Sequence, residues 1–592
     1  MVRLRPAVRL VALAMLAAAC IPDLGPQPGD TSPIPDNCLE VPAAVSSEKV
    51  TLLTRLAEEF NAEQREFNGE CAVITVQRQA SGKAADLLAT GWPDDGSEGP
   101  APVLWSPASS AWGAVLNQRL QAAGKAAMAS DFERIMLTPL VLAMPRPMAE
   151  ALGWPEADIG WTDILALAQD PAGWGAKGHP EWGPFRLGKT NPNFSTSGLS
   201  ATIAIYYAAT GKISGLSAAD VADPAAGEFV RGVEAATVHY GDTTLTFLEN
   251  MYREDQAGRS LSYASAVAVE EVSVIAYNRG DPADAGIENP VPPRVPLVAV
   301  YPKEGTLFSD NPAYILDAPW VEDVHRQAAA AFRDFVIDDL DNQKAVLEFG
   351  FRPGNPAVAI GDPISEANGL NPNKPETELQ VPEPAVLAAL VEGWEGYRKT
   401  ARVIIVLDVS GSMGEIGGDG FTKLDLAKRA VISSLDRFKP EDEIGLWIFS
   451  TNLNGADDFL ELIPPSPLST VREQIERHVE GLIADGGTGL HDTTRAAVAA
   501  MRRDFDTTKI NAVLLLTDGK CEDDPPGCDL AGLVQFLDSP EREIVRVFPV
   551  AYGEDANTDE LTAIANASRA RLYLATNPLT IERVFEQVVS NF

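Results

Sequence analysis

The sequence predicts an α/β protein whose C-terminal part, residues 400–592, forms a doubly wound parallel sheet. Two continuous apolar runs, at residues 403–407 (VIIVL) and 512–516 (AVLLL), have the length and composition of strands buried on both faces. Further helix-like and strand-like patterns alternate with them, at residues 424–438, 444–449, 470–482, 492–501, 545–551, 558–567, 571–574 and 580–589. This alternation predicts a parallel sheet with helices on both faces.

Length and charge limit the classes of function. A chain of 592 residues with 45% apolar residues is long enough for several globular domains. Its formal net charge of −37 repels nucleic acid and anionic lipid surfaces. We therefore expect no nucleic-acid partner, and we expect membrane contact through a lipid anchor alone.

Residues 1–19 have the pattern of an export signal. Three arginines precede an apolar run at residues 10–19, which is shorter than the roughly 20 residues that a membrane-spanning helix needs. The run ends in Ala-Ala-Ala-Cys20 and resembles a bacterial lipoprotein box, which implies acylation of Cys20 and anchoring on the outer face of the cell membrane. Ala17 stands where that box usually has a larger aliphatic residue, so plain secretion is the alternative. Residues 20–40 are rich in proline and glycine and predict a tether.

The remaining cysteines predict two disulfides. The chain has five cysteines, and assigning Cys20 to lipid leaves an even number, which fits an oxidising compartment. Cys38 and Cys71 lie in one N-terminal segment, while Cys521 and Cys528 bracket one short loop. We expect these two pairs to be bridged. No histidine lies beside them, which disfavours a zinc site.

Three motifs at predicted strand ends or in nearby loops indicate a metal site. Asp408, Ser410 and Ser412 follow the first buried strand, Thr488 lies in a glycine-rich turn, and Asp518 follows the AVLLL strand. Ligands in such folds bind beyond the carboxyl ends of the strands. Three hydroxyls and two carboxylates are hard oxygen donors that suit Mg²⁺, with Mn²⁺ as the next choice.

Together these motifs resemble the metal-ion-dependent adhesion site of the von Willebrand factor A family. The resemblance covers about a third of the chain and includes all five positions. It implies a Rossmann-like domain whose bound ion takes a carboxylate from a partner protein. We expect His491, close to Thr488, to have a packing role or a role at the helix start rather than to bind the ion.

Residues 41–360 resemble, less specifically, the extracellular solute-binding proteins of ABC importers. The resemblance rests on short segments such as SGK at 81–83, VLWSP at 103–107, FSTSG at 194–198 and GFRP at 350–353. It implies two α/β lobes that close on a small solute, and the candidate contacts are Ser81, Ser106, Ser197 and Tyr263. Hydroxyls and backbone N–H groups at helix starts suit an anion, although for any single serine ordinary helix capping is the favoured interpretation.

Residues 361–399 are expected to be a linker and a connecting helix before the C-terminal domain at 400–592. The whole order resembles bacterial substrate-binding and VWA domain-containing lipoproteins. We expect a non-enzymatic surface protein that binds a protein partner through the metal and a solute through the N-terminal region. The alternative is an importer receptor with an accessory A domain and an ABC permease as partner. A hydrolase is disfavoured because no GxSxG motif or suitably placed histidine base is present.

Overall fold

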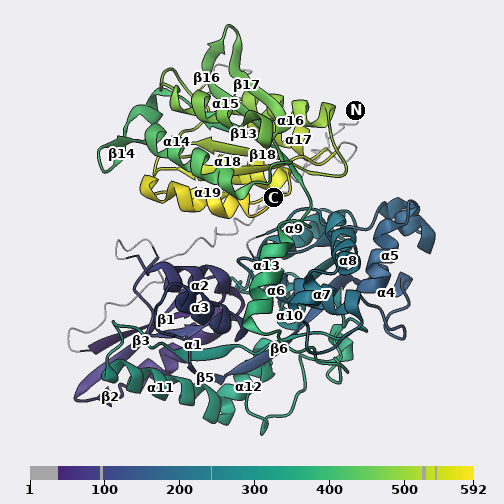
Figure 1. Cartoon of the computed structure of the whole chain (residues 1–592), viewed down its shortest axis with the longest axis vertical. Coiled ribbons are helices and arrows are strands. Elements are labelled where there is room, and N and C mark those ends of the chain that lie inside the picture. The colour runs from purple at the N-terminus through teal and green to yellow at the C-terminus, as the bar shows by residue number, and fades with distance from the viewer. Residues whose placement is uncertain (1–37, 94–97, 242, 523–527, 540–542) are drawn as a thin grey trace, which may run out of the picture.

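The computed structural model describes residues 38–93, 98–241, 243–522, 528–539 and 543–592. Their fold is mixed α/β, as predicted, with three six-stranded sheets and one two-stranded sheet. Two of the large sheets form the N-terminal region, in the lower half of Figure 1, and the third forms the C-terminal domain above it. The signal, the site at Cys20 and most of the tether lie outside the described residues.

The first N-terminal sheet has the strand order β2-β3-β1-β4-β11-β5 and defines lobe 1. Parallel pairing of β1 with β3 and β4 forms its centre, while β11 and β5 are antiparallel additions. The elements of lobe 1 are β1 (Cys38–Val45), α1 (Val50–Ala62), β2 (Glu66–Phe67), β3 (Glu70–Arg78), α2 (Ser81–Thr90), β4 (Leu104–Ser106), α3 (Ala111–Ala122), β5 (Asp131–Arg134), β11 (Pro312–Ile315) and α11 (Asp323–Asp338).

The second sheet defines lobe 2 and is built around the long strand β6, which pairs with β8, β9, β10 and β12. Its elements are β6 (Met136–Pro145), α4 (Arg146–Ala151), α5 (Trp161–Gln169), β7 (Leu187–Gly188), α6 (Thr196–Thr210), α7 (Ala218–Val221), α8 (Pro224–Ala235), α9 (Thr244–Gln256), β8 (Ala266–Glu270), α10 (Glu271–Arg279), β9 (Leu297–Val300), β10 (Phe308–Ser309) and β12 (Arg352–Pro353). Helix α12 (Leu340–Phe349) connects α11 of lobe 1 to β12.

Three crossings join the lobes: one runs through α12, and the other two adjoin each other. The chain passes from β5 to β6 through Ile135, and it returns from β10 to β11 through residues 310–311. The amide of Ile135 donates a hydrogen bond to the carbonyl of Asn311, 3.2 Å away, so the crossings lie side by side. A paired double connection of this kind provides a hinge between two lobes.

The C-terminal sheet has the order β17-β16-β13-β18-β19-β20, and every neighbouring pair is parallel except β16 and β17. The elements are β13 (Ala401–Asp408), β14 (Ile416–Gly418), β15 (Phe421–Thr422), α14 (Lys423–Ser434), β16 (Glu443–Asn454), β17 (Asp457–Pro467), α15 (Leu468–Glu480), α16 (Leu490–Arg503), β18 (Ile510–Thr517), α17 (Leu530–Leu537), β19 (Arg546–Tyr552), α18 (Thr558–Ala567), β20 (Tyr573–Ala575) and α19 (Ile581–Val589).

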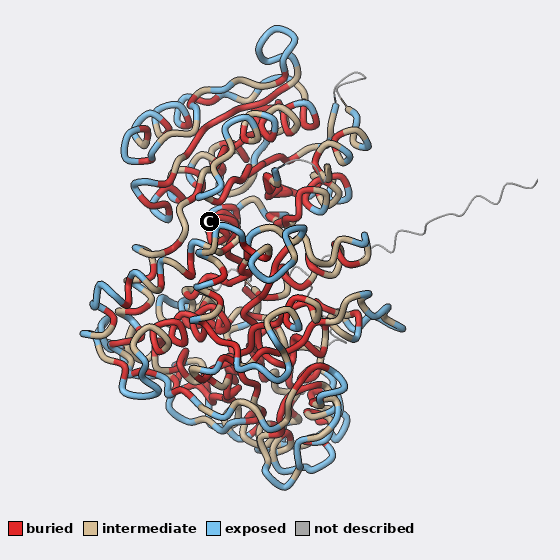
Figure 2. Tube along the Cα trace, turned by 90° about the vertical axis from the view of Figure 1, so that its right-hand side faces the viewer, coloured by how far each residue is buried: buried red, intermediate tan, exposed pale blue. Residues whose placement is uncertain are grey.

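Strand β13 shows why this sheet is covered on both faces. Val403, Ile405 and Leu407 pack into one hydrophobic cluster with α14, α15 and α19. Ile404 and Val406 point the other way and pack into a second cluster with α16, α17 and α18. Alternate residues of a strand face opposite sides, so a continuous apolar run is required where both sides are buried. The central strands are accordingly buried along their length (Figure 2).

Residues 361–383 lie against lobe 2, where Ile364, Leu370 and Leu379 are buried. They lead into α13 (Pro384–Trp394), the predicted connecting helix, which ends at the junction with the C-terminal domain. The chain terminus, Phe592, is buried at the same junction (Figures 1 and 2).

A buried polar cluster fixes this junction. The carboxylate of Glu234 in α8 accepts hydrogen bonds from Tyr240 Oη at 2.8 Å and Trp394 Nε1 at 2.9 Å. Lys189 Nζ lies 2.9 Å from the same carboxylate, and both side chains of this ion pair are fully buried. Tyr240 Oη in turn accepts a hydrogen bond from the amide of Lys399, two residues before β13. Lobe 2, α13 and the C-terminal domain are therefore joined through the carboxylate of Glu234 and its hydrogen-bond partners.

Both predicted disulfides are present. Cys38 and Cys71 are register partners on the parallel strands β1 and β3, with Cα atoms 4.5 Å apart. Cys521 and Cys528 are bridged across the loop after β18, with Cα atoms 5.7 Å apart. Their presence fits an oxidising, extracytoplasmic setting. Within the described residues, no helix is long and apolar enough to cross a membrane.

Candidate functional site

The predicted metal ligands gather where the strand order of the C-terminal sheet reverses. The next strand of this sheet along the chain after β13 is β16, its neighbour on one side, and β18 lies on its other side. Asp408 is the last residue of β13, and Asp518 directly follows β18. The carboxyl ends of adjacent parallel strands share one edge of the sheet, so both carboxylates are brought to the crevice where such folds bind ligands.

Asp408 is a fully buried carboxylate held by two hydrogen bonds. Its Oδ1 accepts from the amide of Ser410 at 2.8 Å, and its Oδ2 accepts from the hydroxyl of Thr517 at 2.6 Å. Burial raises the pKa of Asp408 to about 7, with the charge of Asp518 as a smaller contribution and the hydrogen bonds opposing the rise. Among the described residues, Asp408 has no ion-pair partner, so its negative charge is uncompensated whenever the carboxyl is ionised.

A chain of hydroxyl groups links the two loops. Ser412 Oγ donates to Asp518 Oδ1 at 2.7 Å and lies 3.1 Å from Ser410 Oγ. The side chain of Asp518 is fully buried. The structure therefore brings Ser410, Ser412 and Asp518 into direct contact, while the amide of Ser410 connects them to Asp408.

The glycine-rich turn that carries Thr488 is fastened to the same edge. The amide of Gly411 donates to Gly486 O, and the amide of Thr451 donates to Gly487 O, both at 2.9 Å. Thr488 is buried, and a Cβ added to Gly519 would lie 3.0 Å from its Oγ1. The hydroxyl of Thr488 thus lies against the backbone next to Asp518, and a larger residue at Gly519 would crowd it.

Two further residues belong to the site, and the sequence analysis does not identify them. Thr517 binds Asp408, as described above. Lys423, the first residue of α14, places its Nζ 2.9 Å from Asp518 Oδ2 and 3.2 Å from Glu415 Oε2. Lys423 could have been noticed in the sequence, because a lysine at the first position of a helix is disfavoured by the helix dipole and therefore suggests a specific anionic partner.

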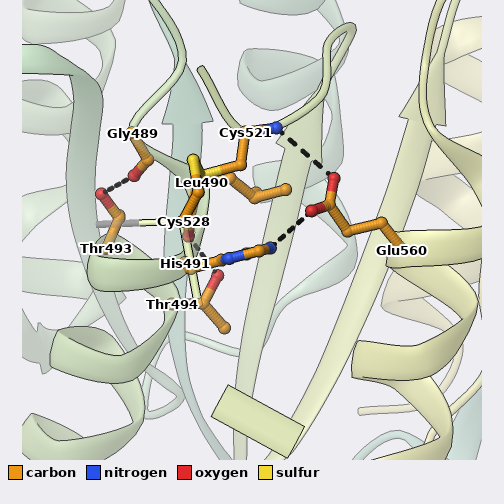
Figure 3. The surroundings of a disulfide bond; sticks show 8 residues. All are labelled: Gly489, Leu490, His491, Thr493, Thr494, Cys521, Cys528 and Glu560. Carbon is orange, nitrogen blue, oxygen red and sulfur yellow. Dashed lines mark hydrogen bonds and ion pairs between the residues drawn. A yellow bond between two sulfur atoms is a disulfide. The ribbon is translucent and has the colours of Figure 1, made fainter. Parts of the chain in front are cut away.

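His491 binds Glu560 rather than one of the candidate ligands (Figure 3). Its Nε2 lies 2.6 Å from Glu560 Oε1, and the imidazole is almost completely buried. The other oxygen of Glu560 accepts a hydrogen bond from the amide of Cys521 at 3.4 Å. Glu560 therefore connects α16 to the loop closed by the Cys521–Cys528 disulfide. Residues 523–527 (DDPPG) of that loop lie outside the described part of the chain.

The donor set fits a hard divalent cation. All five predicted ligands offer oxygen, and the buried charge of Asp408 lacks a cation. Within the described residues, no group of three or more His, Cys, Asp or Glu side chains could hold a metal, so this site depends on hydroxyls beside its two carboxylates. That composition suits Mg²⁺ or Mn²⁺ and excludes the soft-ligand sites of zinc or copper.

A separate small cavity of about 30 Å³ lies between the two N-terminal lobes. Lobe 1 contributes residues 46–48 and the start of α2, and lobe 2 contributes the starts of α6 and α9 together with Glu270. Most of the lining side chains carry hydroxyls: Ser46, Ser47, Ser81, Ser195, Thr196, Ser197, Thr243 and Thr244. Burial raises the pKa of Glu270 to about 8, so this carboxyl holds a proton at neutral pH.

Two of the four predicted solute contacts, Ser81 and Ser197, line this cavity. Ser106 lies on β4, where its hydroxyl donates to Pro312 O at 2.7 Å within the sheet of lobe 1. Tyr263 is buried in lobe 2, and its Oη lies 2.7 Å from His239 Nε2. Neither Ser106 nor Tyr263 is among the residues that line the cavity.

Comparison with known families identifies the C-terminal fold. Residues 403–520 match the family model of the von Willebrand factor type A domain. The C-terminal domain is therefore a von Willebrand factor type A domain. The matched region of this A domain spans β13 to β18 and contains all five candidate metal ligands. A search of curated proteins finds no match to the whole sequence.

Solved structures resemble each half separately. The von Willebrand factor type A protein from Catenulispora acidiphila is 23% identical, with a TM-score of 0.28; the alignment covers 32% of this chain and 42% of that chain. The periplasmic binding protein AfuA from Actinobacillus pleuropneumoniae, solved with fructose-6-phosphate, is 12% identical, with a TM-score of 0.39 and coverage of 62% and 100%. The periplasmic binding protein P5PA is also 12% identical, with a TM-score of 0.38 and coverage of 61% and 99%. This chain thus spans less than half of the Catenulispora protein.

The raised pKa of Asp408 gives the metal-free A domain a characteristic pH dependence. Unfolding lowers this pKa toward its usual 3.8, so the unfolded chain loses the proton first as pH rises. The group's contribution to the free energy of unfolding therefore falls between about pH 4 and 7, at about 1.4 kcal/mol per unit, and is constant above 7. Urea unfolding in chelator, compared between wild type and Asp408→Asn, measures it. The stability advantage of the variant should grow from pH 4 to 7 and then level off; a constant difference contradicts the assignment.

Proposed function

We propose that this protein is a cell-surface binding protein whose A domain captures a protein partner through Mg²⁺, with Mn²⁺ as a substitute. The proposed ligands are Asp408, Ser410, Ser412, Thr488 and Asp518. The observation that carries the proposal is the convergence of these oxygen donors on the buried, uncompensated charge of Asp408.

When bound, the ion would offer a coordination position to a carboxylate of the partner. The chain's own residues prepare that position. Asp408 is oriented by Thr517 and by the amide of Ser410, so its oxygens are fixed before a ligand arrives. Two carboxylates balance a divalent charge but leave a six-coordinate ion short of strong ligands, which favours an anionic partner group.

The N-terminal region is proposed to bind a small anionic solute in the cavity between the lobes. Three helices, α2, α6 and α9, begin at this cavity, so the positive ends of their dipoles lie beside it. The hydroxyls add neutral donors, and a protonated Glu270 can donate as well. The alternative function, an importer receptor that delivers this solute to an ABC permease, uses the same cavity and makes the A domain an accessory.

The remaining parts of the proposal concern location and chemistry. Acylation of Cys20 would hold the protein on the outer face of the membrane, and the two disulfides support an exported protein. The proposed role is binding rather than catalysis. Intact-mass measurement of the membrane fraction distinguishes an acylated Cys20 from plain secretion.

The metal bridge predicts that Asp408→Ala abolishes Mg²⁺ binding while the sheet stays folded, because the variant removes a ligand at a strand end. Thr488→Ala should keep some Mg²⁺ binding but weaken partner capture, because it removes one neutral oxygen donor and leaves both carboxylates in place. The measurement is a pull-down from envelope extract with and without chelator, using Asp457→Ala at an exposed position of β17 as an acidic-to-alanine control. Recovery of the same partners by wild type and Asp408→Ala under both conditions contradicts the bridge.

The solute proposal predicts that a small anion stabilises the full chain. It should also lower the radius of gyration measured by small-angle scattering, because the lobes close. At a concentration of 100 times Kd, the stabilisation is about 2.7 kcal/mol. We expect a thermal shift with at least one anion of a panel that includes inorganic phosphate and sulfate, and a smaller shift in the Ser81→Ala/Ser197→Ala variant. The proposal fails if no anion shifts the wild-type unfolding temperature, or if the double variant responds equally.

A further inference from the structure

Lys423 is a buried cation in direct contact with one of the proposed metal ligands. Its side chain is only 8% exposed, and its ammonium group makes an ion pair with Asp518, whose side chain is completely buried. It is also the first residue of α14, at the helix end where the dipole opposes a positive charge. The position therefore carries an electrostatic cost, which the contact with Asp518 offsets.

Packing holds Lys423 in this position. Its amide donates to Glu415 O at 2.8 Å, and its carbonyl accepts from Tyr552 Oη at 2.9 Å. The aliphatic part of the side chain runs along Gly553, where an added Cβ would lie 3.5 Å from Lys423 Cε. The ammonium group is thus aimed at Asp518 by its backbone and its neighbours.

We infer that Lys423 is an internal cation that lowers the affinity of the A domain for its divalent ion and holds the donor set together when the ion is absent. The inference rests on the proposed metal site. Asp518 would contact both the ammonium group and the divalent ion, so the two positive charges repel each other at short range. Without the ion, the ammonium balances one of the two buried carboxylates. Ser412, which donates to the other oxygen of Asp518, then stays in place.

The test is Mg²⁺ titration of the full chain by calorimetry, with Mg²⁺ as the only ligand, for wild type, Lys423→Met and Lys423→Arg. Removal of the charge in Lys423→Met should tighten Mg²⁺ binding by at least about tenfold. It should also lower the unfolding temperature in chelator, because Asp518 loses its partner. Lys423→Arg keeps the charge and should stay near wild type. Lys428→Met, on the same helix, is the control, because Lys428 Nζ bonds to Glu480 O instead.

The outcomes separate this inference from the proposal beneath it. If wild type binds no Mg²⁺, the proposed metal site itself fails, and the inference with it. If wild type binds Mg²⁺ but Lys423→Met binds it equally or more weakly, only the role of Lys423 is overturned. Lys423→Gln, a second neutral variant, must agree with Lys423→Met, and circular dichroism confirms that both are folded.

An independent set of contacts shows that the A domain touches both lobes. On lobe 2, Arg569 of the A domain lies 2.8 Å from Glu254, and Arg259 lies 2.8 Å from Asp538 of the A domain. On lobe 1, Glu98 makes an ion pair with Arg583 of α19. The A domain therefore contacts both lobes, and its C-terminal helix, α19, makes the contact with lobe 1.

These contacts involve the segments that line the solute cavity. In lobe 1, Glu98 Oε2 is bound by Lys83 Nζ at 2.7 Å and by Gln79 Nε2 at 3.1 Å, and these two residues flank Ser81. In lobe 2, Asn191 Nδ2 donates to Ser590 O just beyond α19, at 3.3 Å. The carbonyl of Asn191 accepts from the amide of Ser195 in the cavity wall.

The lobes themselves are in contact at the cavity. The amide of Gly82 donates to Phe194 O at 3.0 Å, and Trp112 Nε1 donates to Thr196 Oγ1 at 2.9 Å. A Cβ on Gly82 would lie 2.5 Å from Asn193 O, so this approach requires glycine. Opening the lobes would separate these groups and would also pull Glu98 away from Arg583.

We propose that α19 acts as a strap across the cavity, so that closed lobes and a docked A domain stabilise each other. This proposal deepens the solute-binding function by assigning its regulation to the A domain. Inside the A domain, α19 packs against α14, the helix that begins with Lys423.

Hydrogen exchange of the full chain without added solute tests the strap and does not depend on the solute's identity. Arg583→Gln and Glu98→Gln should each speed exchange by at least about threefold at residues 81–84 and 194–198, because the lobes open more often. Arg437→Gln is the control, since Arg437 pairs with Glu586 of α19 inside the A domain, 2.7 Å away. Exchange at wild-type rates in both test variants overturns the strap, whatever the outcome of the solute panel.

Discussion

The carboxylate of Glu234 is the interaction on which the arrangement of this molecule depends. It lies in lobe 2 with no exposed surface, and it binds Lys189, Tyr240 and Trp394. Tyr240 also accepts a hydrogen bond from the amide of Lys399, just before β13. An unpaired charge at this depth would cost several kcal/mol, so all the partners must be in place together. Their assembly sets the A domain on lobe 2 in one orientation. That orientation places α19 beside lobe 1.

The sequence predicts most of the A domain because the physical constraints there are local. Strands buried on both faces must be continuous apolar runs, and β13 and β18 appear where such runs occur. The ligands follow these strands directly, so a correct strand assignment also brings Asp408 and Asp518 to one edge. Strand β17 (Asp457–Pro467) is not predicted, because it is an antiparallel edge strand whose prolines and exposed positions hide its pattern.

Long-range pairings limit what the sequence analysis can reach. Lys423 and Asp518 are 95 positions apart, and Glu98 and Arg583 are 485 apart, so no spacing rule connects them. The solute contacts show the same limit. Serines at helix starts are recognisable, and Ser81 and Ser197 do line the cavity. Nothing local distinguishes them from Ser106, whose hydroxyl instead bonds to Pro312 O within the lobe 1 sheet. The disulfides are predictable because few cysteines leave few ways to pair them.

The position of the Cys38–Cys71 disulfide has a mechanical consequence. If the chain is held through the residues before Cys38 while the A domain grips a partner, tension enters the fold at the first residue of β1. Cys38 and Cys71 are directly opposite each other at the start of a parallel pair, so the covalent bond passes part of that load to β3 at once. The two strands then resist together, and β1 cannot be peeled from β3 one hydrogen bond at a time. The same bond that stabilises lobe 1 at rest thus makes it an attachment point suited to pulling.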